Sequence, residues 1–183
     1  MEKESRIILE GKRFQLMVER LCHELIEQHG NFEDTCLIGI QPRGPYLGER
    51  IIKRLSNILG KSNLEYGTLD VTFHRDDFRR RDVILIPNPT QMDFIVEKKK
   101  VVLLDDVLYT GRTIRAALNA LQHFGRPSKV ELAVLVDRRF NRHLPIFADY
   151  KGMVVDTVDK AYIKVEWEEI GGKDKVTLHS ERI

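Results

Sequence analysis

The sequence predicts an α/β fold in which helices flank a central, mostly parallel sheet. Two short apolar runs, residues 36–40 and 101–104, are each followed by a turn and then by a segment with helical spacing. A third run, residues 130–136, is almost continuously apolar, which is typical of a strand buried in a parallel sheet. Strands that alternate with helices indicate βαβ units, and residues 101–137 are predicted to form one complete unit.

The first half of the chain supplies two further predicted helices. Apolar residues recur at helical spacing between Phe14 and Ile26, and Gly30 ends the pattern, so we expect a helix over residues 12–29. After the strand at 36–40 and the turn Gln-Pro-Arg-Gly-Pro at 41–45, a second helical pattern covers residues 46–59. A strand, a Pro/Gly turn and a helix together form a geometry suited to binding phosphate.

A charged stretch follows the next predicted strand. Residues 67–73 alternate, with Leu69, Val71 and Phe73 on one face, which predicts a strand. Residues 74–82 are densely charged, and 83–86 and 94–96 are candidate strands of a small hairpin. An excursion of this length is more often functional than structural, so we expect a lid that brings Arg75 over the site. A merely solvated loop is the alternative.

The remaining elements complete a single domain. The apolar face that runs from Ile114 to Phe124 predicts a helix, and Gly125 ends it. In the tail, alternation over residues 161–167, a turn at 171–174 and a return at 176–178 predict a terminal hairpin. The chain contains no internal repeat, linker or low-complexity tract, so residues 1–183 are expected to form one domain.

Composition restricts the class of protein. Hydrophobic residues make up 42% and charged residues 32% of the chain, and no apolar stretch approaches the about 18 residues of a membrane span. The first residues lack the apolar core of a signal peptide, so a cytoplasmic location is expected. Cys22 and Cys36 are predicted to be buried thiols, and the scattered histidines predict no metal site. A net charge of +2 is too small to indicate nucleic-acid binding.

The chemistry is concentrated in residues 100–113, Lys-Val-Val-Leu-Leu-Asp-Asp-Val-Leu-Tyr-Thr-Gly-Arg-Thr. Asp105 and Asp106 follow the apolar run, where two carboxylates can accept hydrogen bonds from two neighbouring sugar hydroxyls. The turn at 110–113 offers hydroxyls, a glycine and a helix N-terminus, which together favour a phosphate. A ribose 5-phosphate would satisfy both halves. The alternative is an ordinary strand–turn–helix with a solvated acid pair.

This motif resembles the loop that binds phosphoribosyl pyrophosphate (PRPP) in the type I phosphoribosyltransferases. The family pattern is a hydrophobic strand, two acids, a short spacer and Thr-Gly-x-Thr, and Arg43-Gly44 matches the pyrophosphate loop of the same family. The resemblance implies the type I phosphoribosyltransferase fold, with a small hood and a flexible, β-hairpin-like loop beside the central sheet.

Further segments resemble the PyrR group of this family, the pyrimidine-operon regulators that are also uracil phosphoribosyltransferases. They include residues 38–51, 69–78, 101–118, 125–138 and 144–152. Purine-specific relatives carry an acid where this chain has Tyr109, which favours a pyrimidine base. The resemblance implies ribose binding by Asp105 and Asp106, PRPP binding also by Tyr109, Thr110, Gly111, Arg112 and Thr113, pyrophosphate binding by Arg43, Gly44 and Arg75, and base binding by Val136, Asp137 and Arg138.

The expected reaction is the conversion of uracil and PRPP into UMP and pyrophosphate. The resemblance implies Mg²⁺ bound through PRPP, with no direct protein ligand, and a homodimer or higher homo-oligomer. A transferase for another base is one alternative. The other is a UMP-sensing attenuator that binds RNA, which Arg20, His23, Arg138 and Arg142 favour. Glu19 and Phe147 argue against RNA, because one adds an anion and the other replaces an arginine that relatives often carry.

Overall fold

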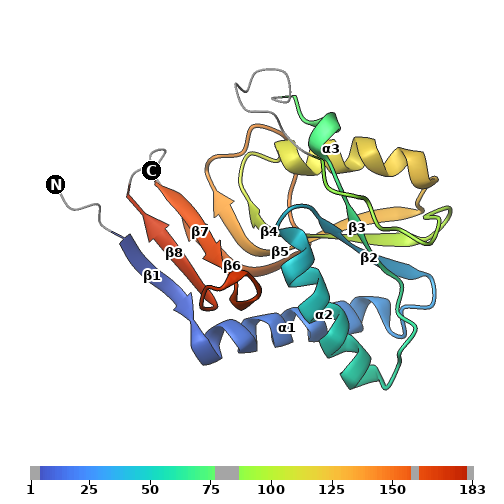
Figure 1. Cartoon of the computed structure of the whole chain (residues 1–183), viewed down its shortest axis with the longest axis horizontal. Coiled ribbons are helices and arrows are strands. Elements are labelled where there is room, and N and C mark those ends of the chain that lie inside the picture. The colour runs from blue at the N-terminus through green and yellow to red at the C-terminus, as the bar shows by residue number, and fades with distance from the viewer. Residues whose placement is uncertain (1–4, 77–86, 158–160, 181–183) are drawn as a thin grey trace.

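A computed structural model of the chain describes residues 5–76, 87–157 and 161–180. Its centre is a five-stranded sheet with the order β3-β2-β4-β5-β6, in which every neighbouring pair is parallel (Figure 1). The strands are β2 (Thr35–Ile40), β3 (Tyr66–Leu69), β4 (Lys100–Leu108), β5 (Lys129–Arg139) and β6 (Tyr150–Asp156). The predicted fold class is confirmed.

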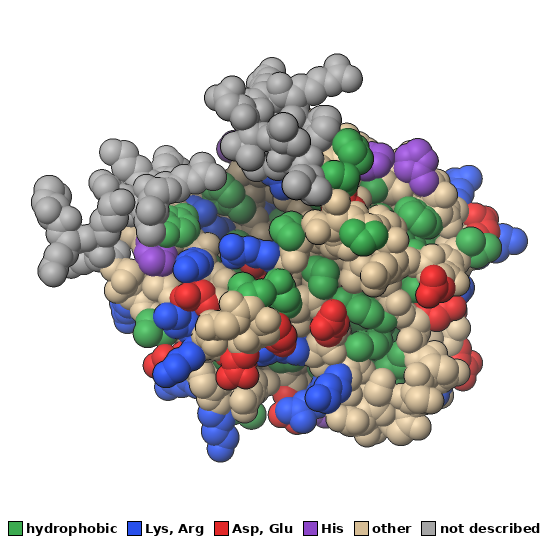
Figure 2. All heavy atoms as spheres, in the orientation of Figure 1, with side chains coloured by type: hydrophobic (Ala, Val, Ile, Leu, Met, Phe, Trp, Pro, Cys, Tyr) green, Lys and Arg blue, Asp and Glu red, His purple; other side chains and the backbone are tan. Residues whose placement is uncertain are grey.

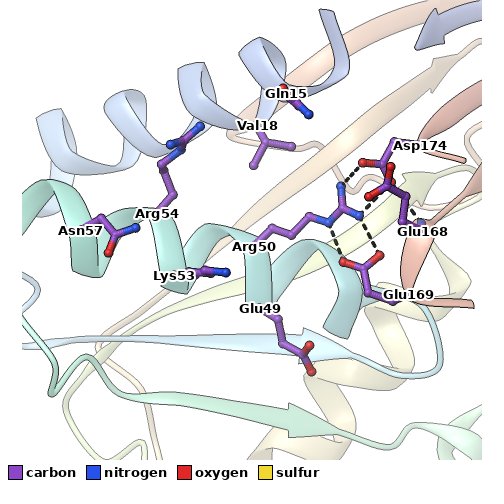
Figure 3. Close-up of a pocket in the computed structure, with 10 residues that line it drawn as sticks. All are labelled: Gln15, Val18, Glu49, Arg50, Lys53, Arg54, Asn57, Glu168, Glu169 and Asp174. Atoms are coloured by element: carbon purple, nitrogen blue, oxygen red, sulfur yellow. Dashed lines mark hydrogen bonds and ion pairs between the residues drawn. The ribbon is translucent and has the colours of Figure 1, made fainter. Parts of the chain in front are cut away.

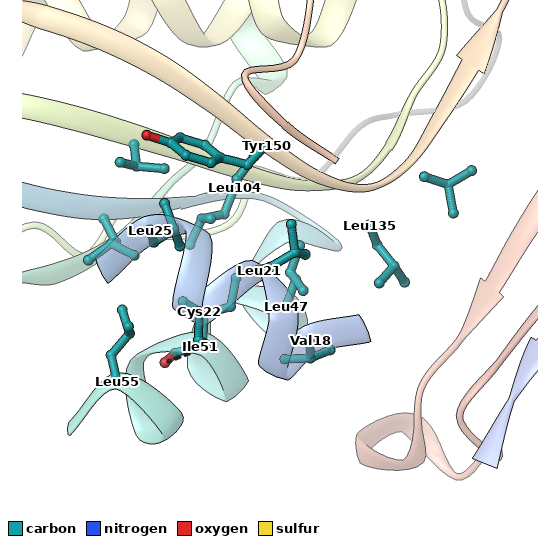
Figure 4. Packing of buried hydrophobic residues seen from close by; sticks show 14 of the residues in the cluster. Val18, Leu21, Cys22, Leu25, Leu47, Ile51, Leu55, Leu104, Leu135 and Tyr150 are labelled. Atoms are coloured by element: carbon teal, nitrogen blue, oxygen red, sulfur yellow. Dashed lines mark hydrogen bonds between the residues drawn. The ribbon is translucent and has the colours of Figure 1, made fainter. Parts of the chain in front are cut away.

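Helices cover both faces of this sheet (Figure 1). The helices α1 (Gly11–His29) and α2 (Gly44–Leu59) lie on one face, and α3 (Arg112–Leu121) lies on the other. Side chains alternate across β4, so that Val102 and Leu104 pack under α1 and α2, whereas Val101 and Leu103 face α3. Figure 4 shows the first of these two apolar clusters, where side chains of both helices meet those of the sheet. The continuous apolar runs thus reflect strands that are buried on both sides.

A second, smaller sheet forms the hood. It has the antiparallel order β1-β8-β7, built from β1 (Ser5–Glu10), β8 (Lys175–His179) and β7 (Tyr162–Glu166), and it lies beside the central sheet (Figure 1). The predicted terminal hairpin is therefore confirmed, and β1 is a strand that the sequence analysis did not predict. Trp167 is fully buried beneath the hood, with its ring edge-on to Phe14 of α1 at a centroid distance of 5.4 Å.

An arginine of α2 ties the hood to the helical layer. The guanidinium of Arg50 donates two hydrogen bonds to Glu169, both at 2.7 Å, and two to Asp174, at 2.6 and 2.7 Å (Figure 3). It also lies over the Trp167 ring, 5.0 Å from the centroid. We call these four residues the Arg50 clamp. Paired bidentate contacts fix both distance and orientation, so the clamp sets how the hood sits on α2.

One predicted strand is shorter than expected, and one candidate strand is absent. The strand expected over residues 67–73 ends at Leu69, and residues 72–74 form the 3-10 turn η1 (Thr72–His74), which leaves Phe73 62% exposed. Asp70 stabilises this turn, because its carboxylate accepts hydrogen bonds from the backbone amide of Thr72 at 2.9 Å and from its hydroxyl at 3.0 Å. Residues 94–96 form no strand, although Val96 is buried and its amide donates to the carbonyl of Phe124.

The candidate strand at 83–86 and most of the predicted lid lie outside the described residues. Two other strands are longer than predicted. β4 continues past the apolar run to Leu108 and β5 to Arg139, because their backbones stay paired, with Leu108 opposite Asp137. Asp105 and Asp106 therefore lie inside β4 rather than after it. Cys22 and Cys36 are buried and free, as predicted. Among the described residues, no helix is long and apolar enough to cross a membrane.

Candidate active site

The strand order places several polar loops at one edge of the sheet. From β2 the chain continues to β3 on one side, whereas β4 lies on the other side of β2 and leads outward to β5 and β6. The carboxyl ends of β2 and β4 are thus neighbours at the point where the winding reverses. Ligands of open α/β sheets bind in the crevice at this switch point. The loop after β2 carries Arg43, and β4 ends in the predicted phosphate motif.

The acid pair, Asp105 and Asp106, is held inside the protein at this edge. Each residue is only 7% exposed, and Oδ1 of Asp105 accepts the amide of Asp106 at 2.9 Å. Burial raises the pKa of both carboxyls; the charge of Asp106 raises the pKa of Asp105 further, and Arg43 partly offsets the rise for Asp106. Oδ2 of Asp106 is buried and, among the described residues, receives no hydrogen bond. Such an atom is an acceptor ready for a ligand hydroxyl.

Arg43 reaches the acid pair because of the glycine that follows it. A Cβ atom on Gly44 would overlap the carbonyl oxygen of Leu104, so only glycine lets α2 start this close to β4. Nη1 of Arg43 lies 3.7 Å from Oδ2 of Asp106 and 3.4 Å from the carbonyl oxygen of Val165 in the hood, to which it donates a hydrogen bond. The guanidinium is about half exposed, so it can contact an anion as well as Asp106.

The turn at 110–113 starts α3 in the way the motif predicts. Gly111 has a φ of 89°, in the left-handed region that favours glycine, and α3 begins at Arg112. No side chain caps this helix start, and the amide of Arg112 makes only a long contact, 3.4 Å, to Oγ1 of Thr110. The first-turn amides of α3 can therefore point at a phosphate. The loop after β5 supports the turn, since the amide of His143 donates to the carbonyl of Thr110.

The charge of Arg75 acts on the acid pair. Arg75 directly follows η1, and its positive charge acts to lower the pKa of Asp105, against the larger effect of burial. The neighbouring Asp76 accepts hydrogen bonds from Arg112 and, at 2.7 Å, from Nη2 of Arg115. Sequence spacing indicated no partner for Asp76, because these contacts join residues that are 36 and 39 positions apart.

The residues expected to bind the base lie at the same edge, with their side chains turned inward. Val136 is fully buried, and Asp137 and Arg138 are each 4% exposed. Asp137 accepts a hydrogen bond from Arg142, and Arg138 donates to Oγ1 of Thr157 at 3.0 Å and to the carbonyl of Ala161 at 2.8 Å. The guanidinium of Arg138 also lies 4.0 Å from the centroid of the Tyr109 ring. The side chains of Asp137 and Arg138 therefore support Tyr109 and the following loop more than they face a ligand, and Val136 is part of the apolar core.

The sequence is similar to those of known proteins over most of its length. Residues 5–170 match the phosphoribosyl transferase domain family. A relative named Bifunctional protein PyrR, from Desulfosudis oleivorans, is 42% identical over 181 residues, which are 98% of this chain and 99% of that protein. A protein of the same name from Bacillus mycoides is 40% identical over 97% of this chain and 98% of that protein.

Solved structures show the same fold at low identity. A hypoxanthine phosphoribosyl transferase from Trypanosoma cruzi matches with a TM-score of 0.71 and 12% identity over 98% of this chain and 93% of that one. A hypoxanthine phosphoribosyltransferase from Staphylococcus aureus matches with a TM-score of 0.66 and 19% identity over 93% and 90% of the two chains. With a family match over most of its length and relatives at 40% identity over nearly all of it, this chain belongs to the phosphoribosyltransferase family.

Proposed function

We propose that this enzyme transfers the ribose 5-phosphate group of PRPP to uracil, with UMP and pyrophosphate as products. The observation that carries the proposal is the juxtaposition of the buried acid pair, the uncapped start of α3 and Arg43 at one switch point of the sheet. PRPP presents a diol, a 5′-phosphate and a pyrophosphate, and each of these finds one of the three features.

The acid pair is suited to the ribose. Oδ2 of Asp106 and the remaining oxygen of Asp105 can accept the two hydroxyls, and this would supply the donor that the buried Asp106 oxygen lacks. The 5′-phosphate would lie on the amides of Thr110, Gly111, Arg112 and Thr113, where the helix dipole favours negative charge. The sugar is thereby held at both ends, which orients its anomeric carbon.

The leaving pyrophosphate is met by positive charge. Arg43 lies 3.7 Å from Asp106 and the charge of Arg75 acts on Asp105, so both can stabilise the charge that develops as the bond to pyrophosphate breaks. The carboxylates in turn stabilise the positive character that the sugar ring gains. No nucleophilic side chain is needed, because N1 of uracil adds to the anomeric carbon directly: the N1 proton is released to solvent and the bond from that carbon to pyrophosphate breaks.

Mg²⁺ fits this site as an ion that arrives with the substrate. Within residues 5–76, 87–157 and 161–180, no group of three or more His, Cys, Asp or Glu side chains could hold a metal. The two buried carboxylates are oxygen ligands of the hard type that Mg²⁺ prefers, and they lie where they would contact an ion through the ribose hydroxyls. When bound, the ion would neutralise charge on the pyrophosphate.

The base is expected to lie beside Tyr109. This side chain is 38% exposed at the end of β4, and the buried Arg138 supports its ring from behind. We propose that Val136, Asp137 and Arg138 contribute by positioning: Asp137 holds Arg142, which also donates to the carbonyl of Tyr109. An aromatic face at this point accepts a planar base, and a phenol is a weaker base than the carboxylate of purine-specific relatives.

A panel of free bases tests the substrate. Uracil, hypoxanthine, guanine, adenine and orotate are each incubated with PRPP and Mg²⁺, and pyrophosphate release is measured. We expect turnover with uracil well above the others. Turnover with a purine in place of uracil would contradict the proposed base and leave the sugar-phosphate site intact.

The double variant Asp105→Asn, Asp106→Asn tests the site itself. Removing both charges should lower PRPP turnover by about 10³-fold or more, because the sugar then loses its two charged acceptors. Circular dichroism and a thermal melt check that the fold is retained. Turnover equal to the parent chain would mean that the ribose binds elsewhere.

A second candidate function, binding of RNA in response to UMP, is implied by the resemblance to the PyrR group, and relatives of that name are about 40% identical to this chain. Most of the basic residues that would bind RNA already form hydrogen bonds within the protein. Arg20 donates to Glu24 and to the carbonyls of Lys151 and Gly152, both at 2.6 Å, and Arg138 is buried. Acidic and basic side chains are interspersed over the described part of the face in Figure 2. A gel shift with a leader hairpin, with and without UMP, tests this function.

We propose that the active form is a cytoplasmic homodimer or higher homo-oligomer of a single-domain chain. The free thiols of Cys22 and Cys36 are consistent with a reducing compartment. Light scattering coupled to size exclusion measures the assembly, and a monomer at working concentration would overturn that part of the proposal.

A further inference from the structure

The segment of residues 70–76, which we call the arm, is fixed at both ends by a carboxylate. At its start, Asp70 accepts hydrogen bonds from both Thr72 groups and from the amide of Asn88 at 3.1 Å. At its end, Asp76 bridges Arg112 and Arg115 on the first turn of α3. Between these points the arm rests on η2 (Gln122–Phe124), the 3-10 turn that follows α3, with the ring centroids of His74 and His123 5.5 Å apart.

Asp76 stands one residue from Arg75, and Arg112 belongs to the predicted phosphate turn. The two guanidinium groups hold the pKa of Asp76 below its usual range, although desolvation acts in the opposite direction, so the carboxylate is charged at neutral pH. A charged carboxylate that receives two guanidinium hydrogen bonds has a restricted position, and the residue joined to it by one peptide bond is restricted too. The arm therefore ends with the backbone of Arg75 in a restricted position, and the charge of Arg75 is one of those that act on Asp105.

We infer that Asp76 is a positioning residue, which docks on Arg112 and Arg115 and thereby holds Arg75 beside Asp105 for the departure of pyrophosphate. This inference rests on the proposed function and adds a residue to it. It also assigns Arg112 a second role, because its guanidinium is engaged by Asp76, so that its contact with the 5′-phosphate comes from its backbone amide.

The contact also links the two halves of the site. Arg112 is the first residue of α3, whose amides would receive the phosphate. Because Arg112 also holds Asp76, a shift of this turn would move Asp76 and, with it, the adjacent Arg75. Binding of the sugar phosphate and placement of the pyrophosphate arginine are thus joined through one carboxylate. A misplacement of about 1 Å is enough to lower a rate on the order of 100-fold.

The test uses steady-state formation of UMP from uracil and PRPP by the full-length chain. Asp76→Asn keeps the size of the side chain and removes its charge. We expect kcat to fall on the order of 10- to 100-fold, with KM for uracil changed less than about twofold. Asp76→Glu should recover part of the loss. Asp93→Asn, which changes another exposed aspartate outside the arm, is the matched control and should turn over like the parent.

A double-mutant cycle with Arg75→Gln shows whether Asp76 acts through Arg75. If it does, the double variant Asp76→Asn, Arg75→Gln should be no slower than Arg75→Gln alone. Losses that multiply would overturn the inference, because they would show two independent roles. So would a parent-like kcat for Asp76→Asn. Arg115→Gln removes one partner of the same carboxylate from the side of α3, and the inference requires a smaller loss of kcat with the same non-additivity.

Failure of this inference is distinguishable from failure of the proposed function. If Asp76→Asn is fully active while Arg75→Gln and the Asp105, Asp106 double variant are impaired, only the inference falls. If the Arg75 and acid-pair variants are also fully active, the proposed site itself is wrong.

Discussion

At the scale of single residues, the acid pair shows how a functional site carries unfavourable energy. Asp105 and Asp106 are adjacent, nearly buried and able to repel each other, and burial is the main cause of their raised pKa. The protein retains them at a cost in stability, which the proposed contacts with ribose hydroxyls and a cation would offset on binding. This cost can be measured directly, because it depends on pH.

We predict that Asp105→Asn raises the melting temperature at pH 7.5 while it lowers turnover. A carboxyl whose pKa in the folded state lies above its ordinary 3.8 binds protons more tightly when folded, so folding stability falls as pH rises from about 4 toward that raised pKa. Asparagine has no such penalty and still accepts the amide of Asp106. A gain of about 1 kcal/mol corresponds to about 2–4 °C for a chain of this size.

Scanning calorimetry of both proteins at pH 4.5 and pH 7.5 provides the measurement. The difference between variant and parent should be larger at pH 7.5. A variant that is less stable than the parent at pH 7.5 would show that the Asp105 charge is compensated within the protein, contrary to the direction of its pKa shift.

At the scale of elements, the hood depends on α2 for its position. β7 supplies the carbonyl of Val165 to Arg43, so the hood touches the proposed pyrophosphate loop directly. The Arg50 clamp holds the segment between β7 and β8, where Glu169 and Asp174 receive four hydrogen bonds from one guanidinium (Figure 3). The hood and α2 are therefore joined by contacts that a change in Arg50 would loosen.

We predict that Arg50→Met lowers the free energy of unfolding by about 2–3 kcal/mol, because Asp174, whose side chain is 9% exposed, loses its counterion. Methionine keeps the apolar stem that packs on Trp167. Urea unfolding followed by the fluorescence of Trp167, the single tryptophan of the chain, measures the loss.

Arg54→Met on the same helix is the matched control. Arg54 lies 3.6 Å from Glu19, and both side chains are well exposed, so its removal should cost no more than about 0.5 kcal/mol. Equal losses for the two variants would contradict the prediction, since they would mean that the Arg50 clamp contributes no more than an exposed ion pair.

At the scale of the whole molecule, a buried polar network joins α1 to the sheet at the edge opposite the proposed site. Nδ1 of His29 contacts Oγ1 of Thr35 at 3.1 Å, and its Nε2 lies 3.1 Å from the hydroxyl of Tyr150 and 3.2 Å from Oε2 of Glu131. Lys100, Lys129 and Asp34 also act on this histidine. Desolvation lowers the pKa of His29 below 6.5, and it outweighs the opposing charge of Glu131.

We predict that His29 contributes a loss of stability as pH falls from 7.5 to 5.5. A histidine whose folded pKa is lowered stays neutral in the folded protein, whereas the unfolded chain binds a proton as pH falls through about 6.5, so folding becomes less favourable by up to about 1.4 kcal/mol per pH unit. The loss is absent above the unfolded pKa. Urea unfolding at several pH values measures it.

His29→Gln should lower stability at pH 7.5, where its hydrogen bonds are lost, and should flatten the dependence between pH 7.5 and 5.5. His23→Gln, which changes an exposed histidine on the same helix, should leave the pH dependence as it is. An unchanged slope in His29→Gln would assign the effect to other groups.

Much of the fold was predictable because its signals are local. The helices at 12–29 and 46–59 and the strands around residues 36–40 and 101–104 follow from periodicity and from Gly and Pro at their ends. The strand β1 was missed because its partner is β8, so that Arg6 pairs with Leu178, and a six-residue edge strand has no local signal that identifies a partner so far along the chain. Asp70 ended the predicted strand at 67–73 early through a side-chain contact, which periodicity does not reveal.

The sequence by itself determined the family and the kinds of chemistry that the chain carries: an acid pair, a glycine-containing phosphate turn and an arginine before glycine. Only the tertiary structure decided which of these groups remain available. The side chain of Arg138, a residue expected to bind the base, donates to Thr157 and Ala161, whereas Oδ2 of Asp106 is left without a hydrogen-bond donor among the described residues. Hydrogen-bond satisfaction depends on neighbours from distant segments, and the folded chain alone brings these together.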